Sequence, residues 1–347
     1  MSHGFSRLLA FSSQRAAKRA LCLVAGLALI GFAPATWAQN NPTFAGGGKL
    51  SNTSKGSPAM ATNTSTGVTC MVYQDQSSSD LAAVSSTNST SWGNTVNTGY
   101  PMSNSIVTVA YLNPYFYVLF ATSTGLQETT STNCINFNPA TQPLINSPYG
   151  YDYSQQIGLT AWAPPGGTPS LYLSVNVGLP GGGIEPAVLS SLNGSDFENF
   201  QVPYGGSINS GTSLLAFTPP GASSQHLYLA FTQGASNLPV IAQTSDGSTW
   251  TSQQDTSFQV GGDPNLVAFT ASGNTSQALY LFGRSNFSEH NLWVAATYDG
   301  VTFTPAYEYG MSLNDSPSDV TGGNGDLISS FHSNFSSTNL WSYYASY

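Results

Sequence analysis

The stretch TSDGSTWT, residues 244–251, decides the fold because variants of it recur along the chain. Each copy reads Ser or Thr, any residue, Asn or Asp, three further residues, and then Trp or Phe. The other copies are SSTNSTSW ending at Trp92, STNCINF ending at Phe137, SLNGSDF ending at Phe197 and TYDGVTF ending at Phe303. Their Asn or Asp positions lie 45 to 60 residues apart, a period typical of repeated β-sheet units.

The recurring stretch is interpreted as a structural turn. Asn-Gly or Asp-Gly inside three copies indicates a tight β-hairpin turn. The hydroxyl and the Asn or Asp side chain can satisfy backbone groups of the turn, while the aromatic residue packs between strands. We therefore assign structural roles to Asn88, Trp92, Asn133, Phe137, Asn193, Phe197, Asp246, Trp250, Asp299 and Phe303.

Strand-like segments precede each turn in a fixed order. An apolar run such as LVAFT (266–270) is followed by LYLFG (279–283) and then by WVAAT (293–297). The aromatic residue after the turn begins a fourth strand. No segment shows sustained helical periodicity. Four strands in about 50 residues predict the blade of an all-β propeller.

The last unit is completed by the first. NLWSYYASY (339–347) aligns with NLWVAATYD (291–299), and the chain stops where the turn should begin. TFAGGGKL (43–50) fits the missing outer strand, because Phe44 precedes Ser57-Pro58 by the same 13 residues that separate Trp250 from Asp263-Pro264. We predict six four-stranded blades, starting near 57, 103, 155, 210, 263 and 316, in a ring closed by the N-terminal strand.

The turns resemble the Asp box of the sialidase-like β-propeller superfamily, over residues 43–347. The family's usual box has one more residue between the acid and the Trp, so the resemblance implies the fold rather than an activity. Sialidases of this family hold the sugar carboxylate with three arginines, whereas only Arg284 follows residue 38 here. The resemblance therefore implies the propeller fold, and the lack of an arginine cluster argues against sialidase activity.

The N-terminus predicts export. Four basic residues precede the apolar run CLVAGLALIGF (22–32), which is followed by a small-x-small pattern ending at Ala38. We interpret residues 1–38 as a cleaved signal peptide of a secreted protein, extracellular or periplasmic, without membrane insertion. Cleavage leaves 7 − 4 = 3 basic residues against 16 acidic ones, a net charge of 3 − 16 = −13. This charge argues against a nucleic-acid partner.

Two cysteines, Cys70 and Cys134, follow the signal segment. Export permits a disulfide between them, but two buried thiols fit the sequence equally well because it does not give their separation. His226, His290 and His332 show no ligand spacing with Cys or Glu. We expect neither a metal nor a cofactor.

The segments between blades suggest where a ligand binds. These linkers carry Tyr100, Tyr149, Tyr151, Tyr204 and Tyr309, each near a Gly, and loops of the same face carry Arg284, His290 and His332. Tyr can stack on a sugar ring and hydrogen-bond its edge, and Gly permits close approach. We expect a non-catalytic module that binds neutral carbohydrate, such as a glycan or cell-surface polysaccharide. Alternatively, the tyrosines only seal neighbouring blades.

Two other functions fit the sequence. An exo-acting glycoside hydrolase would use Asp263, in GGDPNL, together with Asp319 or Glu185 as its carboxylate pair. Against this, Ser57 and Ser316 occupy positions equivalent to Asp263, which suggests a generic start of a blade. The remaining alternative is a protein-binding or purely structural surface propeller.

Overall fold

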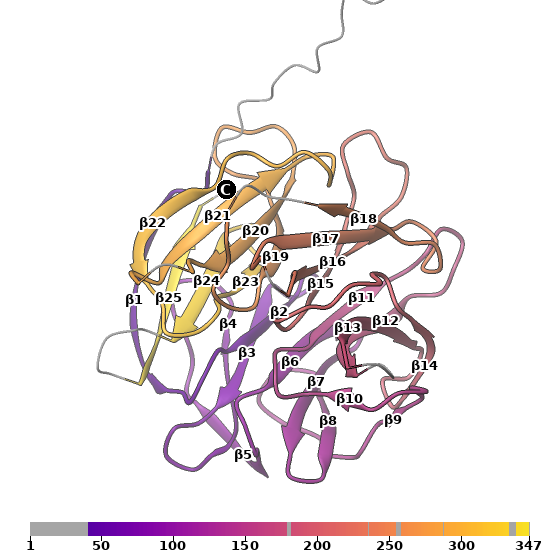
Figure 1. The fold of residues 1–347 in the computed structure, drawn as a ribbon. Coiled ribbons are helices and arrows are strands. Elements are labelled where there is room, and N and C mark those ends of the chain that lie inside the picture. The colour runs from indigo at the N-terminus through magenta and orange to yellow at the C-terminus, as the bar shows by residue number, and fades with distance from the viewer. Residues whose placement is uncertain are drawn as a thin grey trace, which may run out of the picture. The chain divides into compact units, whose positions relative to one another are not determined.

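The computed structural model describes residues 41–178, 182–234, 236–254, 258–286, 288–332 and 338–346. Contacts divide the chain into Met1–Gln39 and Asn40–Tyr347, and everything described belongs to the second unit. The expected signal segment lies outside the described residues. Strands are the only regular secondary structure of the second unit among these residues, and they form six mainly antiparallel sheets around a ring (Figure 1). The predicted six-bladed propeller is confirmed.

Four blades follow the expected order from an inner to an outer strand. Blade 1 contains β2 (Ala59–Asn63), β3 (Val68–Gln74), β4 (Asp80–Ser86) and β5 (Val96–Pro101). Blade 3 contains β11 (Gly158–Trp162), β12 (Ser170–Gly178), β13 (Ile184–Ser191) and β14 (Asp196–Gln201). Blade 4 contains β15 (Ser213–Phe217), β16 (His226–Thr232), β17 (Pro239–Thr244) and β18 (Thr251–Gln254). Blade 5 contains β19 (Asn265–Phe269), β20 (Ala278–Arg284), β21 (Asn291–Thr297) and β22 (Tyr307–Ser312).

Blade 2 departs from this plan. It has three strands, β6 (Val107–Leu112), β7 (Tyr115–Thr122) and β8 (Gly125–Ser131), and its outer strand is reduced to the isolated bridges Ser131↔Phe137 and Glu128↔Thr141. Pro139 and Pro143 interrupt this segment, and proline cannot donate to a strand ladder. The chain then adds β9 (Leu144–Ile145) and β10 (Tyr151–Asp152) to the edges of blade 3.

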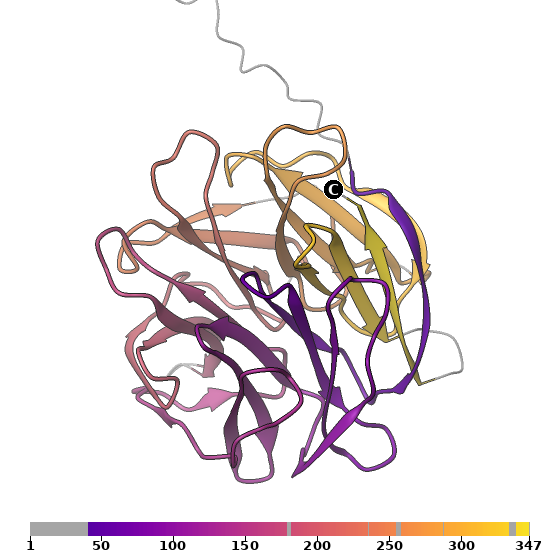
Figure 2. The same ribbon diagram turned by 180° about the vertical axis from the view of Figure 1, so that it is seen from behind.

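Blade 6 joins the two ends of the described chain. It contains β23 (Ser318–Thr321), β24 (Leu327–His332), β25 (Asn339–Ala345) and, outermost, β1 (Phe44–Thr53). The antiparallel register of β1 and β25 runs from Phe44↔Ala345 to Thr53↔Asn339. Figure 2 shows the indigo β1 beside the yellow strands of this blade. The predicted closure by the N-terminal strand is confirmed.

The core lies in the seams between neighbouring blades. Met60 and Val84 of blade 1, for example, pack with Ile328 and Leu340 of blade 6. The inner strands β2, β6, β11, β15, β19 and β23 contact one another around the ring. Apolar seams hold the blades in fixed positions, so the loops at the strand ends are presented on a rigid frame.

The five repeated turns, residues 86–92, 131–137, 191–197, 244–250 and 297–303, share one hydrogen-bond arrangement. In each, backbone N–H groups two and three residues beyond the Asn or Asp donate to its side-chain oxygen at 2.7 to 3.2 Å. The aromatic residue at the end of each turn packs on a core cluster. These contacts fit the structural role expected for the motif.

The residue after the Asn or Asp is left-handed in all five turns. Its φ is 64° at Ser89, 59° at Cys134, 83° at Gly194, 78° at Gly247 and 74° at Gly300. This position also touches the preceding blade. Cys134, in blade 2, forms a disulfide with Cys70 of blade 1, with a Cα–Cα distance of 5.6 Å. The structure therefore pairs the two cysteines between blades.

Candidate functional site

The inner strands surround a central channel of about 330 Å³, and a smaller hollow of about 200 Å³ shares one lining residue with it. We call the smaller hollow the mouth. Residues that precede the inner strands line it: Ser57, Pro58, Ser105, Ile106, Gln155, Gln156, Asp263, Asp315 and Ser316, with Val107 and Ser154. Gln156 lines both spaces. Because the chain enters every inner strand from a blade linker, the mouth lies on the linker face.

Asp263 is fixed at the mouth by backbone amides. The N–H of Gly211 donates to its Oδ1 at 2.5 Å, and its own N–H donates to Ser316 Oγ at 2.7 Å. Burial raises the pKa of the Asp263 carboxyl above its usual value, an effect that the Gly211 and Gln156 amides oppose. Asp263 therefore connects the linkers that enter blades 3, 4 and 6.

Arg284, at the end of β20, holds the backbone beside the mouth. Its guanidinium donates to the carbonyl oxygens of Asn314 and Gly261, both at 2.5 Å. The corresponding positions of blades 1 and 3 do the same with amides: Gln74 donates to Met102 O and Asn176 to Ser210 O, both at 3.0 Å. Arg284 thus has the same linker-binding role as Gln74 and Asn176.

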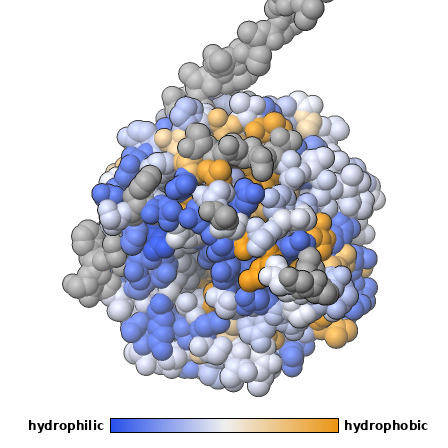
Figure 3. Space-filling model, viewed as in Figure 1, coloured by the Kyte–Doolittle hydropathy of each residue, from blue (hydrophilic) through white to orange (hydrophobic). Residues whose placement is uncertain are grey.

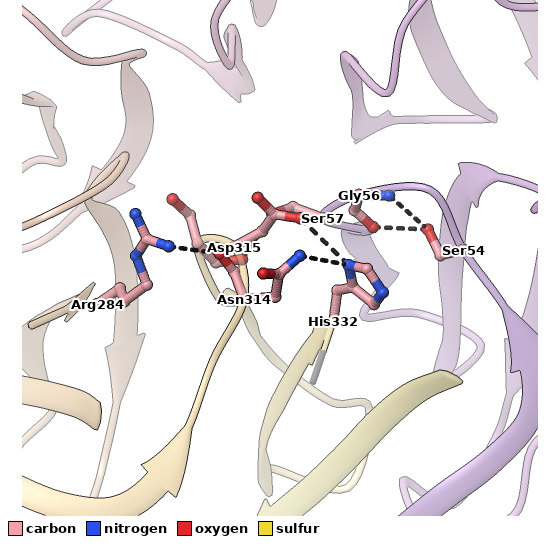
Figure 4. Close-up of polar contacts among 8 residues, drawn as sticks. Ser54, Gly56, Ser57, Arg284, Asn314, Asp315 and His332 are labelled. Carbon is pink, nitrogen blue, oxygen red and sulfur yellow. Dashed lines mark hydrogen bonds and ion pairs between the residues drawn. The ribbon is translucent and has the colours of Figure 1, made fainter. Parts of the chain in front are cut away.

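His332 and Asp315 form an ion-pair geometry at the next position around the ring. His332 Nδ1 lies 3.2 Å from Asp315 Oδ2, and 3.4 Å from Asn314 Nδ2. Figure 4 shows that Arg284 and His332 reach the linker at Asn314 and Asp315 from opposite sides. The His332 side chain is 9% exposed and that of Asp315 is 41% exposed, so the carboxylate is the accessible member of the pair.

Asp319, on β23, lies deeper than Asp263 and lines the channel. Burial raises its pKa to about 8, which the nearby Ser329 hydroxyl only partly offsets. Neither carboxylate oxygen has a hydrogen-bond partner within the described part of the chain. The same holds for Asn265 Oδ1 and Gln156 Oε1, whose residues also line the channel.

The linker tyrosines predicted to bind ligand are all partly buried. Tyr100 stacks on Phe120, Tyr149 meets Phe200 edge-on, and Tyr204 packs on Phe231. Tyr151 contacts Tyr153, while Tyr309 packs on Phe44 and donates to the Pro42 carbonyl. Each ring thus contributes to packing and leaves a part exposed, and none lines the mouth. Their contact with a ligand stays a prediction.

The other predicted site residues are spread over the linker face. His290 is partly buried and left-handed, with a φ of 52°. Of the carboxylates proposed for a hydrolase, Asp263 lies at the mouth, Asp319 in the channel, and Glu185 on β13, lining neither. The structure therefore groups Asp263 with Asp315, Arg284 and His332. Asp315 and Gln156 were not predicted.

The sequence held one signal for the mouth. Ser57-Pro58, Asp263-Pro264 and Ser316-Pro317 occupy equivalent positions, and each opens an inner strand. Their convergence follows from the ring symmetry of a propeller. In contrast, Asp315 stands outside this repeat, so only the folded linker shows its contact with His332.

Across the described ranges, no three His, Cys, Asp or Glu side chains gather in a metal-binding group. The same residues contain no helix that is long and apolar enough to cross a membrane. Viewed from the side of Figure 1, hydrophilic residues cover much of the surface, with smaller hydrophobic patches among them (Figure 3).

No protein-family model matches the chain, and no curated protein matches its sequence. Solved structures do share its fold. A protein of unknown function from Dyadobacter fermentans has a TM-score of 0.59 at 12% identity, covering 87% of this chain and 98% of that one. A mutant of the Aleuria aurantia lectin in complex with Fucα1-6GlcNAc has a TM-score of 0.54 at 11% identity, covering 80% of this chain and 88% of that one.

A sialidase is among the similar structures as well. A Trypanosoma rangeli sialidase mutant displaying trans-sialidase activity has a TM-score of 0.53 at 14% identity, covering 83% of this chain and 53% of that one. At these identities the likeness shows the fold alone. The chain therefore shares the six-bladed propeller with carbohydrate-binding lectins and with a sialidase.

Proposed function

We propose that the chain is an exported, non-catalytic module that binds hydroxyl-rich, non-acidic carbohydrate at the linker face. The observation that carries the proposal is the mouth, which is lined by hydroxyl, amide and carboxylate side chains from several blade linkers together with the aliphatic side chains of Pro58 and Ile106. Such a lining can hydrogen-bond the edge of a sugar ring and cover its apolar face. The shared fold with lectins supports the same conclusion.

The charge of the site argues against acidic sugars. Of the basic side chains in the described residues, none lines the mouth, and Arg284 is engaged with two backbone carbonyls. A sugar carboxylate would face Asp263 and Asp315 without the paired arginines that usually bind such groups. We therefore expect neutral glycans to bind in preference to sialylated or uronic-acid glycans.

The test is binding of the chain to a broad panel of immobilised glycans. Ser154→Trp places a bulky ring at the mouth, and Ser248→Trp places the same bulk on a repeated turn at the opposite face. We expect saturable binding that Ser154→Trp abolishes and Ser248→Trp retains. Tyr149→Ala and Tyr204→Ala test the linker tyrosines in the same assay. Binding lost only in these two variants would move the site from the mouth to the linkers.

Absence of binding to every glycan on the panel would contradict the carbohydrate proposal and favour a protein partner. Export is tested separately by N-terminal sequencing of the protein recovered outside the cytoplasm, which we expect to begin near Gln39. Full-length protein retained in the cytoplasm would contradict export without affecting the binding proposal.

A hydrolase is the second candidate function because Asp263 and Asp315 share the mouth. Two carboxyl groups are the usual minimum for glycoside hydrolysis. Prolonged incubation with any glycan that binds, followed by analysis of released sugars, distinguishes the two functions. Release that disappears in Asp315→Asn would establish catalysis, whereas bound glycan recovered intact supports a lectin.

A further inference from the structure

The channel and its mouth are lined by residues with buried polar atoms that lack hydrogen-bond partners. Gln156 Oε1, Asn265 Oδ1 and both carboxylate oxygens of Asp319 are buried without a hydrogen bond within the described residues. All of these atoms are oxygens, and the amide oxygens of Gln156 and Asn265 are pure acceptors. Asn265 is 8% exposed and Asp319 is 7% exposed. A buried acceptor without a donor is destabilising, so a group that supplies donors to this wall would be bound favourably.

Charges in the hollow have the same sign. Asp263 and Asp315 line the mouth, and no Lys, Arg or His among the described residues lines either space. Asp319 in the channel, whose pKa burial raises to about 8, is neutral at pH 6.5 and adds no charge. Arg284 lies close enough to lower the pKa of Asp263, but its Nη1 and Nη2 groups donate to the Asn314 and Gly261 carbonyls. Its buried Nε lines neither space and has no hydrogen-bond partner among the described residues. The lining is therefore rich in acceptors, with negative charge at the mouth, and Gln156 lines both spaces.

We infer that the mouth and channel bind a cationic group, an ammonium, carried by the sugar that enters the mouth. An ammonium offers three donors and no acceptor, which matches a lining whose unpartnered atoms are oxygens. A neutral hydroxyl supplies only one donor, and its own acceptor lone pairs cannot partner the unpartnered amide oxygens of this lining. The inference rests on the proposed carbohydrate-binding function and narrows its ligand to amino sugars with a free amine.

An ammonium fits the arrangement of carboxylates better than a metal ion does. Ca²⁺ takes six to eight oxygen ligands, typically with several carboxylates close together. Here Asp263 and Asp315 lie at the mouth and Asp319 lies in the channel, and the described residues form no metal-binding group of three. A metal ion is therefore kept as an outcome of the test.

The experiment compares three sugars that differ only at one substituent. D-glucosamine, N-acetyl-D-glucosamine and D-glucose are titrated into the full chain at pH 6.5, and affinities are measured by calorimetry at low and high salt. We expect glucosamine to bind about five- to tenfold more tightly than the other two, because charge-assisted hydrogen bonds are stronger. High salt should reduce this preference by screening the charges.

Variants separate the site from general electrostatics. Asp315→Asn, at an exposed position, should lower the glucosamine preference several-fold, and Asp263→Asn should do so if it folds. Glu289→Gln removes the same charge from an exposed loop residue that lines neither hollow, and it should change nothing. Equal effects of Glu289→Gln and Asp315→Asn would contradict a specific site.

The outcomes also distinguish this inference from the proposed function. Equal affinity for the three sugars overturns the ammonium site and leaves carbohydrate binding intact. Failure of every sugar here and of every glycan on the panel overturns both. A thermal shift with CaCl₂ alone that Asp319→Asn abolishes, without a glucosamine preference, would replace the ammonium by a metal ion.

Discussion

Gly300 lies against the ring of Tyr228, a residue of the preceding blade. A Cβ built at position 300 would stand 2.5 Å from the tyrosine ring, and the glycine has a φ of 74°. Gly194 approaches Tyr117 in the same way, and Gly247 approaches Trp162. The repeated turns are therefore also contacts between blades, in which a missing side chain lets an aromatic ring come close.

Replacing Gly300 with Ala should destabilise the fold through both the backbone and the contact. Gly221 provides the control, because it has a φ of 86° with no atom within 4 Å of its Cβ position. Gly221→Ala should cost about 1 kcal/mol for the left-handed backbone, and Gly300→Ala about 1–3 kcal/mol more for the clash. Urea denaturation measures both. Equal losses in the two variants would show that the Tyr228 contact is unimportant.

The disulfide occupies the same position in blade 2 that Gly300 occupies in blade 5. Removing it with Cys70→Ala/Cys134→Ala should lower the free energy of unfolding by about 4 kcal/mol, because it links residues 64 apart in sequence. Cys70→Ala/Cys134→Gly should recover part of this loss, since position 134 is left-handed. If the variant with Ala at position 134 is as stable as the variant with Gly there, the backbone of this turn is not strained by a side chain.

Asp319 should make stability depend on pH. Its pKa is about 8 in the folded chain against 3.8 for the free side chain. The folded state therefore retains a proton that the unfolded state releases, so stability falls as pH rises from about 4 to about 8 and levels off above. Asp319→Asn should remove this part of the dependence, up to about 1.4 kcal/mol per pH unit. Parallel stability curves for the two proteins would disprove a buried neutral carboxyl.

Asp246 can be exchanged for Asn because the chain already uses Asn88, Asn133 and Asn193 at this position of the repeated turn. Asp246→Asn keeps an acceptor for the Ser248 and Thr249 amides, whereas Asp246→Ala leaves both without one. We expect a Tm close to that of the unmodified chain for Asn and a clearly lower Tm for Ala.

Stability in acid distinguishes the ionised Asp246 carboxylate from a neutral amide at the same position. These hydrogen bonds hold the pKa of Asp246 below its usual value. The stabilisation from its ionised form is thus present above the unfolded pKa and is lost only as pH falls through the folded value. The advantage of Asp over Asn at position 246 should therefore disappear in strong acid. An Asn variant as unstable as the Ala variant near neutral pH would show that the charge itself is required.

The fold could be predicted because propeller blades repeat. Turn residues such as Asp246 recur at each blade, and the unpaired last unit points to a partner near Phe44. The sequence did not predict the shortened blade 2, where Pro139 and Pro143 replace ladder residues. Local prolines overrode the repeat there, since a residue without an N–H cannot extend a sheet.

The candidate site could be predicted only in part. Arg284, His332 and Asp263 were recognised as polar residues of the linker face, but their grouping depends on how linkers of different blades meet. Asp315 carries no repeat signal, and its importance comes from contact with His332. The exposed fraction of each linker tyrosine also depends on packing partners such as Phe120, which lie far away in sequence.

The pairing of β1 with β25 has a consequence for biosynthesis. When Phe44 emerges from the ribosome, its pairing partner Ala345 has not yet been synthesised, because it lies about 300 residues later in the chain. Five blades can assemble in order of synthesis, but the sixth cannot. Until then β1 and the first blade present unpaired strand edges, the kind of surface on which nascent chains aggregate. Chaperone binding to the unfinished ring should therefore concentrate on its first strand.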